Sequence, residues 1–433
     1  MQTGDIVYSR IGTIGKARLV SVDIRFIISY SCCLIRPLKG YLDTRYVQQF
    51  LESRVALNQA HRSTQGIGVP DLGLGEIKQF KVPLPPLAEQ HRIVAKVDEL
   101  MALCDRLEAA QAERESRRDR LVSASLHRMN QPTQEASSFR KDSQFVLDHL
   151  PRLAARPEYI SGLRQTLLNM AVRGRLVAQD PSDEPAEALG VRARELRRKA
   201  WEASCLEGNR KKYIAPALPS RKPNFELPTG WTWVMWREVG TCQNGRAFPS
   251  TEYSMKGVRL LRPGNLFADG TIVWNSSNTK CLSESWAERF PEFVVGESEI
   301  VMNLTAQSLK DAFLGRACLT AVGEHCLLNQ RIARLTCYAM SPRYTLWLLK
   351  SGAFRDYVDG GLNQGALIQH MFTKQIDEFE FALPPLAEQH RIVAKVDELM
   401  ALCDRLEAQL TTTQTENLRL LEAVLHEALV PVD

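Results

Sequence analysis

The stretch LPPLAEQHRIVAKVDELMALCDRLEA occupies Leu84–Ala109 and recurs, letter for letter, at Leu383–Ala408. Each copy opens with two prolines, which suit a strand exit or a first helical turn and are excluded from a helix interior. A long run of good helix formers without Gly or Pro follows, from Leu87 to about residue 129 and from Leu386 to about residue 429. The sequence therefore predicts two long helices with the same beginning.

Apolar residues inside the repeated stretch follow a spacing of four and three, which is the seam of a heptad pattern. A helix of about 40 residues is about 60 Å long and cannot bury such a seam on a compact globule of its own. We therefore expect the two copies to pack against each other as an antiparallel coiled coil. A helix pair that serves only for oligomerisation is the alternative. The seam of the first copy consists of Ile93, Val97, Leu100, Cys104 and Leu107.

The identity of the two copies extends to polar residues that a seam does not require. Surface positions repeated without change suggest that each helix presents the same docking surface to one of two copies of a partner. The predicted subunit-docking residues are His91, Arg92 and Lys96 in the first helix and His390, Arg391 and Lys395 in the second.

The repetition continues upstream of both helices, where the sequences diverge but remain alignable. YLDTRYVQQFLES at Tyr41–Ser53 aligns with AMSPRYTLWLLKS at Ala339–Ser351, and GDIVYSR at Gly4–Arg10 resembles SEIVMNL at Ser298–Leu304. The chain thus reads as a tandem duplication in which a variable domain precedes a fixed helix twice. Such a pattern is typical of a protein in which selection has diversified the surfaces of the variable domains and kept the helical framework constant.

Short alternating runs broken by Gly, Asn and Ser predict strands and turns in the variable domains, with helical segments near residues 342–358. The fold class is therefore α+β. The first domain lacks a counterpart of the Trp-rich start LPTGWTWVMWREVG at Leu227–Gly240, so we expect Met1 to lie inside a domain. The predicted divisions are a partial first variable domain at 1–84, the first helix at 85–130, a central helical and basic region at 131–215, the second variable domain at 216–384 and the second helix at 385–433.

The composition is that of a globular protein, with 44% hydrophobic and 24% charged residues among 433. No apolar run approaches the roughly 18 residues of a membrane span, and the start has no signal-peptide pattern, so a cytoplasmic location is expected. The ten cysteines form no C-x-x-C pair, which favours reduced thiols. The net charge is +5, with ten Lys or Arg against three Glu between Arg192 and Lys222. This stretch is either a solvated basic helix and linker or a surface that attracts phosphate.

The repeated stretch, the domain opening LPTGWTWV and the central segment LRQTLLNMAVRGRLVAQDPSDEPA at Leu163–Ala186 together resemble the specificity subunit of type I restriction–modification systems, shortened at its N-terminus. The resemblance covers essentially the whole chain. It implies two target recognition domains, the first one partial, each reading half of a split double-stranded DNA site. The two long helices would set the spacing of the half-sites and dock two methyltransferase subunits and, through them, motor and nuclease subunits.

The same resemblance implies a non-catalytic subunit of a complex that methylates DNA adenine and cleaves DNA with ATP. S-adenosylmethionine, ATP and Mg²⁺ would bind the partner subunits, and no cofactor or metal is expected in this chain. The sequence agrees, since it contains no Asn/Asp-Pro-Pro-aromatic tetrapeptide and no H-x-x-x-H pair. Asp71, Glu76 and Lys78 follow the order of a nuclease triad, but their spacing leaves no room for separate strands, so a stand-alone nuclease is disfavoured. A coiled-coil adaptor whose variable domains bind protein is the principal alternative.

Phosphate contacts need Arg or Lys, and base edges are read by Asn, Gln or Arg, whose donors match adenine or guanine in pairs. We looked for these residue types in loop-like contexts; a solvated loop or a turn-capping Asn is the alternative for each of them. The DNA-binding candidates of the first domain are Arg10, Lys16, Arg18, Arg62 and Gln65. Those of the second are Asn244, Arg246, Arg262, Asn265, Asn303, Gln307, Lys310, Gln330, Arg331, Asn363 and Gln364.

Overall fold

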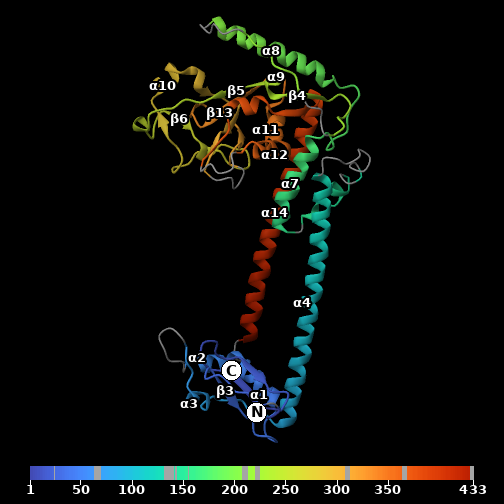
Figure 1. Cartoon of the computed structure of the whole chain (residues 1–433), viewed down its shortest axis with the longest axis vertical. Helices are drawn as coiled ribbons and strands as arrows, with labels where there is room; N and C mark the ends of the chain where they lie inside the picture. Colours follow the sequence, from blue (N-terminus) through green and yellow to red (C-terminus); the bar gives the residue numbers. More distant parts are fainter. Residues whose placement is uncertain are drawn as a thin grey trace. The chain divides into compact units, whose positions relative to one another are not determined.

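The computed structural model describes residues 1–23, 25–62, 70–130, 141, 144–154, 156–206, 213–219, 225–307, 313–362 and 368–429. It divides into two compact units, Met1–Arg117 (unit 1) and Arg118–Asp433 (unit 2). The boundary falls inside the helix α4, Leu87–Asn130. Helices and strands occur in both units (Figure 1), which confirms the predicted α+β class.

Unit 1 is built on a three-stranded antiparallel sheet of order β2-β1-β3. Ile6 and Tyr8, which alternate along β1, are fully buried and pack in one cluster with Phe50 and Leu51 of the helix α1. The alternation is that of a sheet with one covered face. The elements of unit 1 are β1 (Ile6–Ser9), β2 (Ala17–Leu19), β3 (Cys32–Ile35), α1 (Thr44–Glu52), α2 (Arg54–Arg62), α3 (Leu74–Ile77) and the first part of α4.

The entry to β1 is held by an ion pair between Asp5 and Arg36. The Arg36 guanidinium donates to both carboxylate oxygens, over 2.6 and 2.8 Å, and holds the pKa of Asp5 far below its usual range. A depressed carboxyl pKa stabilises the fold above the pKa of the unfolded chain, and the contribution is lost as the pH falls toward the folded pKa.

We therefore expect unit 1 to lose stability as the pH is lowered from about 5 to about 2, and Asp5→Asn to flatten this dependence. Hydrogen exchange of the β1 peptide serves as the probe of thermal unfolding and measures the effect at each pH. Asp105→Asn, a change at an exposed residue of α4 in the same unit, is the control. An Asp5→Asn profile that matches the parent profile would contradict the assignment.

Unit 2 contains a second copy of the unit 1 sheet. Its strands β11, β9 and β13 pair in the order β11-β9-β13 and in the same register: Ile6 faces Leu19 and Ile35, just as Ile300 faces Leu319 and Leu335. The predicted duplication is thus present in the strand pairing. A fourth strand, β5, extends the unit 2 sheet beyond β13.

The rest of the second variable domain surrounds this sheet. A second four-stranded sheet has the order β7-β6-β12-β8, and two-stranded ladders join β4 to β15 and β10 to β14. The strands are β4 (Thr232–Met235), β5 (Gly240–Asn244), β6 (Val258–Leu261), β7 (Cys281–Leu282), β8 (Val294–Val295), β9 (Ile300–Asn303), β10 (Thr305–Ala306), β11 (Ala317–Leu319), β12 (Cys326–Leu328), β13 (Ile332–Cys337), β14 (Gln369–His370) and β15 (Glu380–Leu383).

The helices of unit 2 complete the domain and its support. They include a pair at residues 342–360, which confirms the predicted helical segment. The helices are α6 (Leu150–Leu153), α7 (Pro157–Ala171), α8 (Ala186–Leu206), α9 (Trp236–Val239), η1 (Ser250–Glu252), η2 (Pro263–Asn265), α10 (Glu284–Arg289), η3 (Pro291–Phe293), α11 (Pro342–Lys350), α12 (Gly352–Gly360), α13 (Thr373–Asp377) and α14 (Leu386–Leu429).

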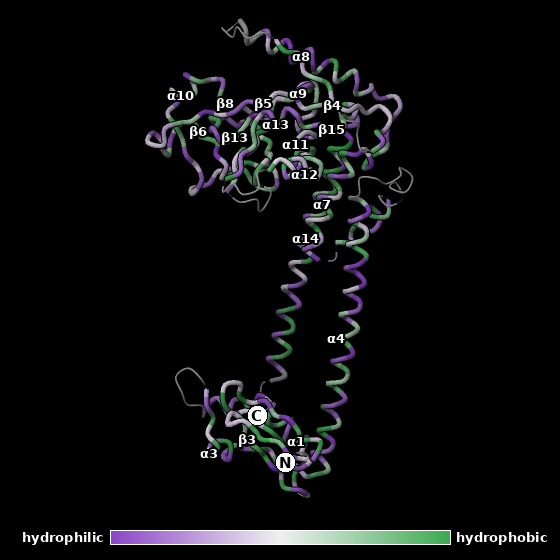
Figure 2. Tube along the Cα trace, viewed as in Figure 1, coloured by the Kyte–Doolittle hydropathy of each residue, from purple (hydrophilic) through white to green (hydrophobic). Residues whose placement is uncertain are grey.

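The two long helices extend as the sequence predicted, over Leu87–Asn130 and Leu386–Leu429. Hydrophilic and hydrophobic residues alternate along α14 in the manner of an amphipathic helix (Figure 2). Ile392, Val396 and Cys403 of its seam are fully buried, and α7 packs along this part of the helix. The predicted partner of this part of the seam is therefore corrected: a helix of the central region covers it, since its 15 residues supply a complementary apolar face.

The helices nevertheless run in opposite directions where unit 2 contains both. The end of α4 follows α7 in parallel, because Asp119 pairs with Arg156 at 3.4 Å and the Met129 carbonyl accepts from Arg173. In contrast, the chain runs against α14 from α7 onward: Arg164 of α7 donates to Asp404 and Glu407, whereas Asp183, which follows α7, pairs with Arg391 nearer the start of α14. The end of α4 and the first part of α14 are thus antiparallel because each packs on α7. Packing of the remaining halves of α4 and α14 on each other stays a prediction.

The seam predicts a sharp difference between two substitutions in α7. Leu167 is fully buried in the cluster that includes Ile392 and Val396, so Leu167→Ala is expected to destabilise unit 2 by about 2–5 kcal/mol. Arg164→Ala removes only partly exposed ion pairs and should cost less than about 1 kcal/mol for each of them. Urea unfolding monitored by the tryptophans, all of which lie in unit 2, compares the two variants. Equal losses would contradict the proposed packing.

Candidate nucleic-acid interface

The same side-chain network fastens each long helix to its variable domain. In unit 1 the Gln90 side chain accepts from the Asp43 amide at 2.8 Å and donates to the Tyr41 and Pro85 carbonyls. In unit 2 the Gln389 side chain accepts from the Ser341 amide at 2.9 Å and donates to the Pro384 carbonyl. Both glutamines are fully buried. Part of the sequence identity between the copies therefore has an intramolecular cause.

An ion pair about two turns beyond the buried glutamine of each helix repeats in the same way. Arg45 bonds to Asp98 at 2.9 Å, and Arg343 bonds to Asp397 at 3.2 Å. These contacts join the start of the helix after the sheet to the long helix in both units. The beginning of each long helix is thus fixed to the variable domain that precedes it in the sequence.

The predicted subunit-docking residues have mixed positions. Arg92, His91 and His390 are exposed, although His91 also lies 3.4 Å from Asp43. Arg391 is engaged within unit 2, donating to Asp183 at 2.5 Å. Lys96 and Lys395 form matching pairs with Glu99 and Glu398, each at 2.9 Å. The exposed residues His91, Arg92 and His390 remain accessible to a partner. Docking through them stays a prediction.

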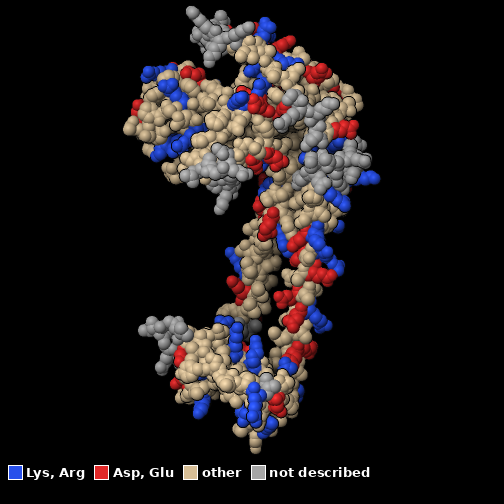
Figure 3. Space-filling view, in the orientation of Figure 1, with Lys and Arg blue, Asp and Glu red and all other residues tan. Residues whose placement is uncertain are grey.

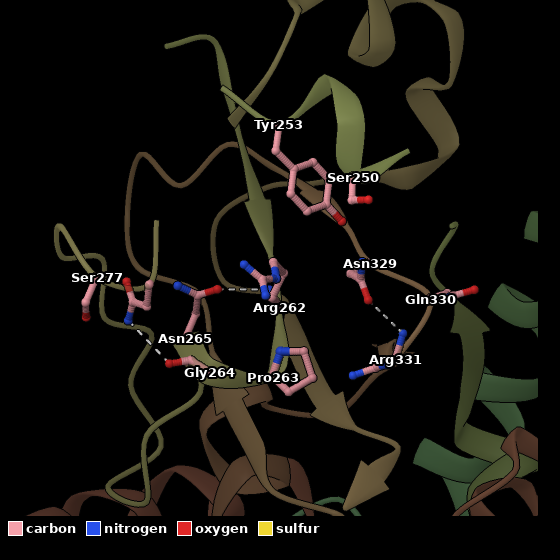
Figure 4. Close-up of a pocket in the computed structure, with 11 residues that line it drawn as sticks. Ser250, Tyr253, Arg262, Pro263, Gly264, Asn265, Ser277, Asn329, Gln330 and Arg331 are labelled. Atoms are coloured by element: carbon pink, nitrogen blue, oxygen red, sulfur yellow. Dashed lines mark hydrogen bonds between the residues drawn. The ribbon is translucent and has the colours of Figure 1, made fainter. Parts of the chain in front are cut away.

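An open cleft of about 530 Å³ lies at one end of the β7-β6-β12-β8 sheet of unit 2. It is formed where the chain leaves β6 into η2 and where it turns from β12 into β13. Arg262, Asn329 and Arg331 lie around its centre, below Tyr253 (Figure 4). Nine of its eleven lining residues have polar side chains, and the lining consists of Ser250, Tyr253, Arg262, Pro263, Gly264, Asn265, Ser277, Asn278, Asn329, Gln330 and Arg331.

Buried amides set the shape of the cleft. The side-chain oxygen of Asn265 accepts from the backbone amide of Arg262 at 2.9 Å, and the side-chain NH2 group of Asn265 donates to the Val273 carbonyl. The Asn329 side chain likewise accepts from the Arg331 amide at 3.2 Å. Asn278 donates to the carbonyls of Gly264 and Val273. These bonds fix the backbone of both turns and leave the arginine side chains to face the opening.

The cleft has the chemistry of an anion-binding and base-reading surface. The Arg262 guanidinium lies 5.8 Å from the centre of the Tyr253 ring, and both residues line the cleft. Arg331 and Gln330 are exposed. Lys and Arg side chains also gather on the part of unit 2 that carries β6 (Figure 3). Arginine forks and amide side chains are the groups that bind phosphates and base edges.

The structure brings four of the predicted DNA-binding residues into this cleft, namely Arg262, Asn265, Gln330 and Arg331. Asn265 is fully buried and shapes the turn, so its position leaves it no surface for a ligand. The sequence reading missed Tyr253, Ser277, Asn278 and Asn329. An aromatic residue near Arg-Pro-Gly-Asn and a second Asn before Gln-Arg are signals that could have indicated them.

The other candidates of the second domain lie elsewhere. Asn303 is fully buried and donates to the Thr305 and Phe313 carbonyls, which makes it a turn-shaping residue. The Arg246 guanidinium lies over the Phe290 ring at 3.8 Å. Asn244 ends β5 and is exposed, as is Gln307. Lys310, Asn363 and Gln364 lie outside the described residues.

The described candidates of unit 1 differ in how far the fold engages their side chains. Arg10 is 6% exposed, bonds to Asp71 at 3.0 Å and lies over the Tyr30 ring, so it is committed to the fold. Arg18 is exposed and bonds to Glu52. Lys16 and Arg62 are exposed. Gln65 lies outside the described residues.

The basic stretch near α8 is partly neutralised. Arg192, Arg194 and Arg198 bond to Glu184, Glu238 and Glu202, with distances of 2.7–2.9 Å. The described part of the stretch is therefore a paired helix face more than an open phosphate surface. No cluster of three or more metal-ligating side chains occurs in the described parts of the chain. Nor is any helix of those parts long and apolar enough to span a bilayer.

Comparison with known proteins places these features in one context. A family model described as "Type I restriction modification DNA specificity domain" matches residues 1–114. The chain is 33% identical over 406 residues to the type I restriction enzyme EcoAI specificity subunit of Escherichia coli, covering 91% of this chain and 66% of that protein. The EcoEI specificity subunit of the same organism is 25% identical with the same coverage. The chain thus spans just under two thirds of the length of these relatives.

Among solved structures, the HsdS subunit from Thermoanaerobacter tengcongensis is similar, with a TM-score of 0.44 and 21% identity over 99% of this chain and 81% of that one.

Proposed function

Because this chain belongs to the family of type I restriction–modification DNA specificity subunits, we propose that it supplies DNA sequence recognition to a methyltransferase complex and performs no catalysis itself. The polar cleft of unit 2 contacts one half of a bipartite site. The exposed parts of the two long helices dock the methyltransferase subunits and, through them, the motor and nuclease subunits. S-adenosylmethionine, ATP and Mg²⁺ are bound by those partners.

The observation that carries this proposal is the pair of arginines, Arg262 and Arg331, facing one cleft on turns that buried amides hold rigid. Pre-ordered turns reduce the entropy lost on binding. A cleft with both guanidinium forks and the exposed Gln330 amide offers phosphate contacts and base-edge contacts side by side. The bonds of Gln389 and the Arg343–Asp397 ion pair hold the recognition domain in a fixed position on α14.

Equilibrium binding of the complex, assembled with its methyltransferase subunits, to labelled duplexes tests the proposal. A preference for one duplex sequence over scrambled duplexes, with affinity that falls steeply as salt rises, is expected because phosphate contacts release counterions. Absence of any sequence preference would reject recognition by this chain. The adaptor alternative predicts an association with protein that salt affects little.

A further inference from the structure

The polar side chains around the unit 2 cleft divide into those that hold the fold and those that remain available to a ligand. The side-chain oxygens of Asn265 and Asn329 accept from backbone amides of their own turns, so both serve the fold. Gln330 and Arg331 are exposed, and their side chains form no hydrogen bond or ion pair with the described residues. These two side chains keep their full bonding capacity for a ligand.

The backbone of Gln330 is held in place at the tip of the turn that joins β12 to β13. Its amide donates to the Arg246 carbonyl at 2.8 Å, and the Arg246 amide donates to the Leu328 carbonyl at 2.9 Å. The chain just beyond β5 therefore braces the turn. Gly245 permits this close approach, because a methyl group at its Cα would overlap the Asn329 carbonyl oxygen.

The size of the cleft decides which part of a duplex it can hold. Its volume of about 530 Å³ is too small for a double helix, whose major groove alone is about 12 Å wide and 8.5 Å deep. The convex sugar–phosphate backbone is the part of a duplex that fits such a cleft. Arg262 and Arg331 supply positive charge there, and no Asp or Glu occurs among the eleven lining residues to repel a phosphate.

A groove runs beside each backbone strand of a duplex, so a side chain next to the cleft is placed to enter that groove. Figure 4 shows Arg262 near the centre of the cleft and Gln330 at its periphery. The amide of Gln330 offers a donor and an acceptor together. In the major groove, adenine presents the matching acceptor N7 and donor N6, whereas guanine presents two acceptors that match an arginine fork.

We propose that Gln330 reads an adenine of the DNA target through the major groove, while Arg262 and Arg331 bind the phosphates beside it. The assignment rests on the proposed function, because it divides the roles within the same DNA-binding cleft. Gln330 is then a specificity-determining residue. Gly245 is a positioning residue, since it contacts no base but lets the turn occupy its place.

The test titrates the complex, assembled with its methyltransferase subunits, against the target duplex and against duplexes with each base pair of the target replaced in turn. Gln330→Ala is expected to reduce discrimination at one A·T pair by about tenfold to a hundredfold. The other positions and the salt slope stay as in the parent, because a neutral amide releases no counterion. Gln330→Arg is expected to prefer guanine at that position, and Gln330→Glu to prefer cytosine, whose N4 group donates to a carboxylate.

Two further variants separate base reading from support of the fold. Thr336→Ala, at an exposed residue of β13 outside the cleft, is the control and leaves discrimination unchanged at every position. Gly245→Ala is expected to weaken discrimination at the same A·T pair as Gln330→Ala, because it displaces the turn. A loss spread equally over all positions would show that Gly245 supports the fold alone.

The outcomes for Gln330 and for the proposed function are distinguishable. If Gln330→Ala or Gln330→Glu retains the parent discrimination at every base pair, or loses affinity equally for all duplexes, the assignment of Gln330 is overturned while the proposed function stands. A parent complex without any sequence preference would reject both. Urea unfolding of Gln330→Ala is expected to match the parent, since the exposed side chain has no bond to the described residues.

Discussion

Gln389→Ala is expected to destabilise unit 2 by about 2–4 kcal/mol and to lower DNA affinity in the same preparation. The side chain is fully buried and bonds to the Ser341 amide and the Pro384 carbonyl. Truncation leaves a buried amide without a partner and opens a cavity between α11 and α14. The Ser341 amide begins α11, so the base of the recognition domain loosens from the long helix.

Gln90→Ala provides the matched variant because its side chain makes the equivalent bonds in unit 1. It should destabilise the region around α1 and leave the unit 2 tryptophan signal unchanged. Urea unfolding followed by tryptophan fluorescence, combined with hydrogen exchange of the α1 and α11 peptides, separates the two. A Gln389→Ala protein with the parent unfolding curve would show that the repeated glutamine does not fasten the domain.

The double substitution Arg262→Ala and Arg331→Ala is expected to weaken DNA binding by about two orders of magnitude while leaving unit 2 folded. Both side chains face the cleft, and the bonds that shape its turns come from the Arg262 and Arg331 backbone amides, which alanine retains. If both guanidinium groups contact phosphate, the slope of log affinity against log salt should fall by about two. A loss at one base position only would instead indicate base reading.

Lys374→Ala is the matched control, because this lysine is an exposed cation of α13 outside the cleft. Titration of each complex against the target duplex at several salt concentrations gives both affinity and slope. Unchanged affinity in the double variant, with the fold intact by circular dichroism, would remove the cleft from the DNA interface.

The sequence predicted the long helices well, because heptad spacing and the absence of Gly and Pro act locally. It also predicted the duplication, which the identical register of the β1 and β9 sheets confirms. The predicted partner of the α14 seam was wrong over Ile392–Cys403, because α7 packs there. A heptad pattern shows which face of a helix is apolar but not which apolar face covers it. With 15 residues, α7 is too short for its own heptad pattern to identify it as the partner of α14.

The candidate site was predictable in residue type but not in side-chain role. Arg262 and Arg331 emerged from their loop context, and the structure places both at one cleft. Asn265 and Asn303 have the same loop context, yet both are fully buried and hold turns. Whether an asparagine faces the backbone or the solvent depends on carbonyls far along the chain, such as that of Phe313 for Asn303, and no local pattern contains that information.

The central claim is that this chain selects the DNA sequence on which its partners act. Sequencing methylated adenines in cells that contain the methyltransferase subunits tests it most directly, with this chain either present or absent. Methylation confined to one split motif only when the chain is present, and lost with Arg262→Ala and Arg331→Ala, is the predicted result. The same motif methylated without the chain would contradict the claim.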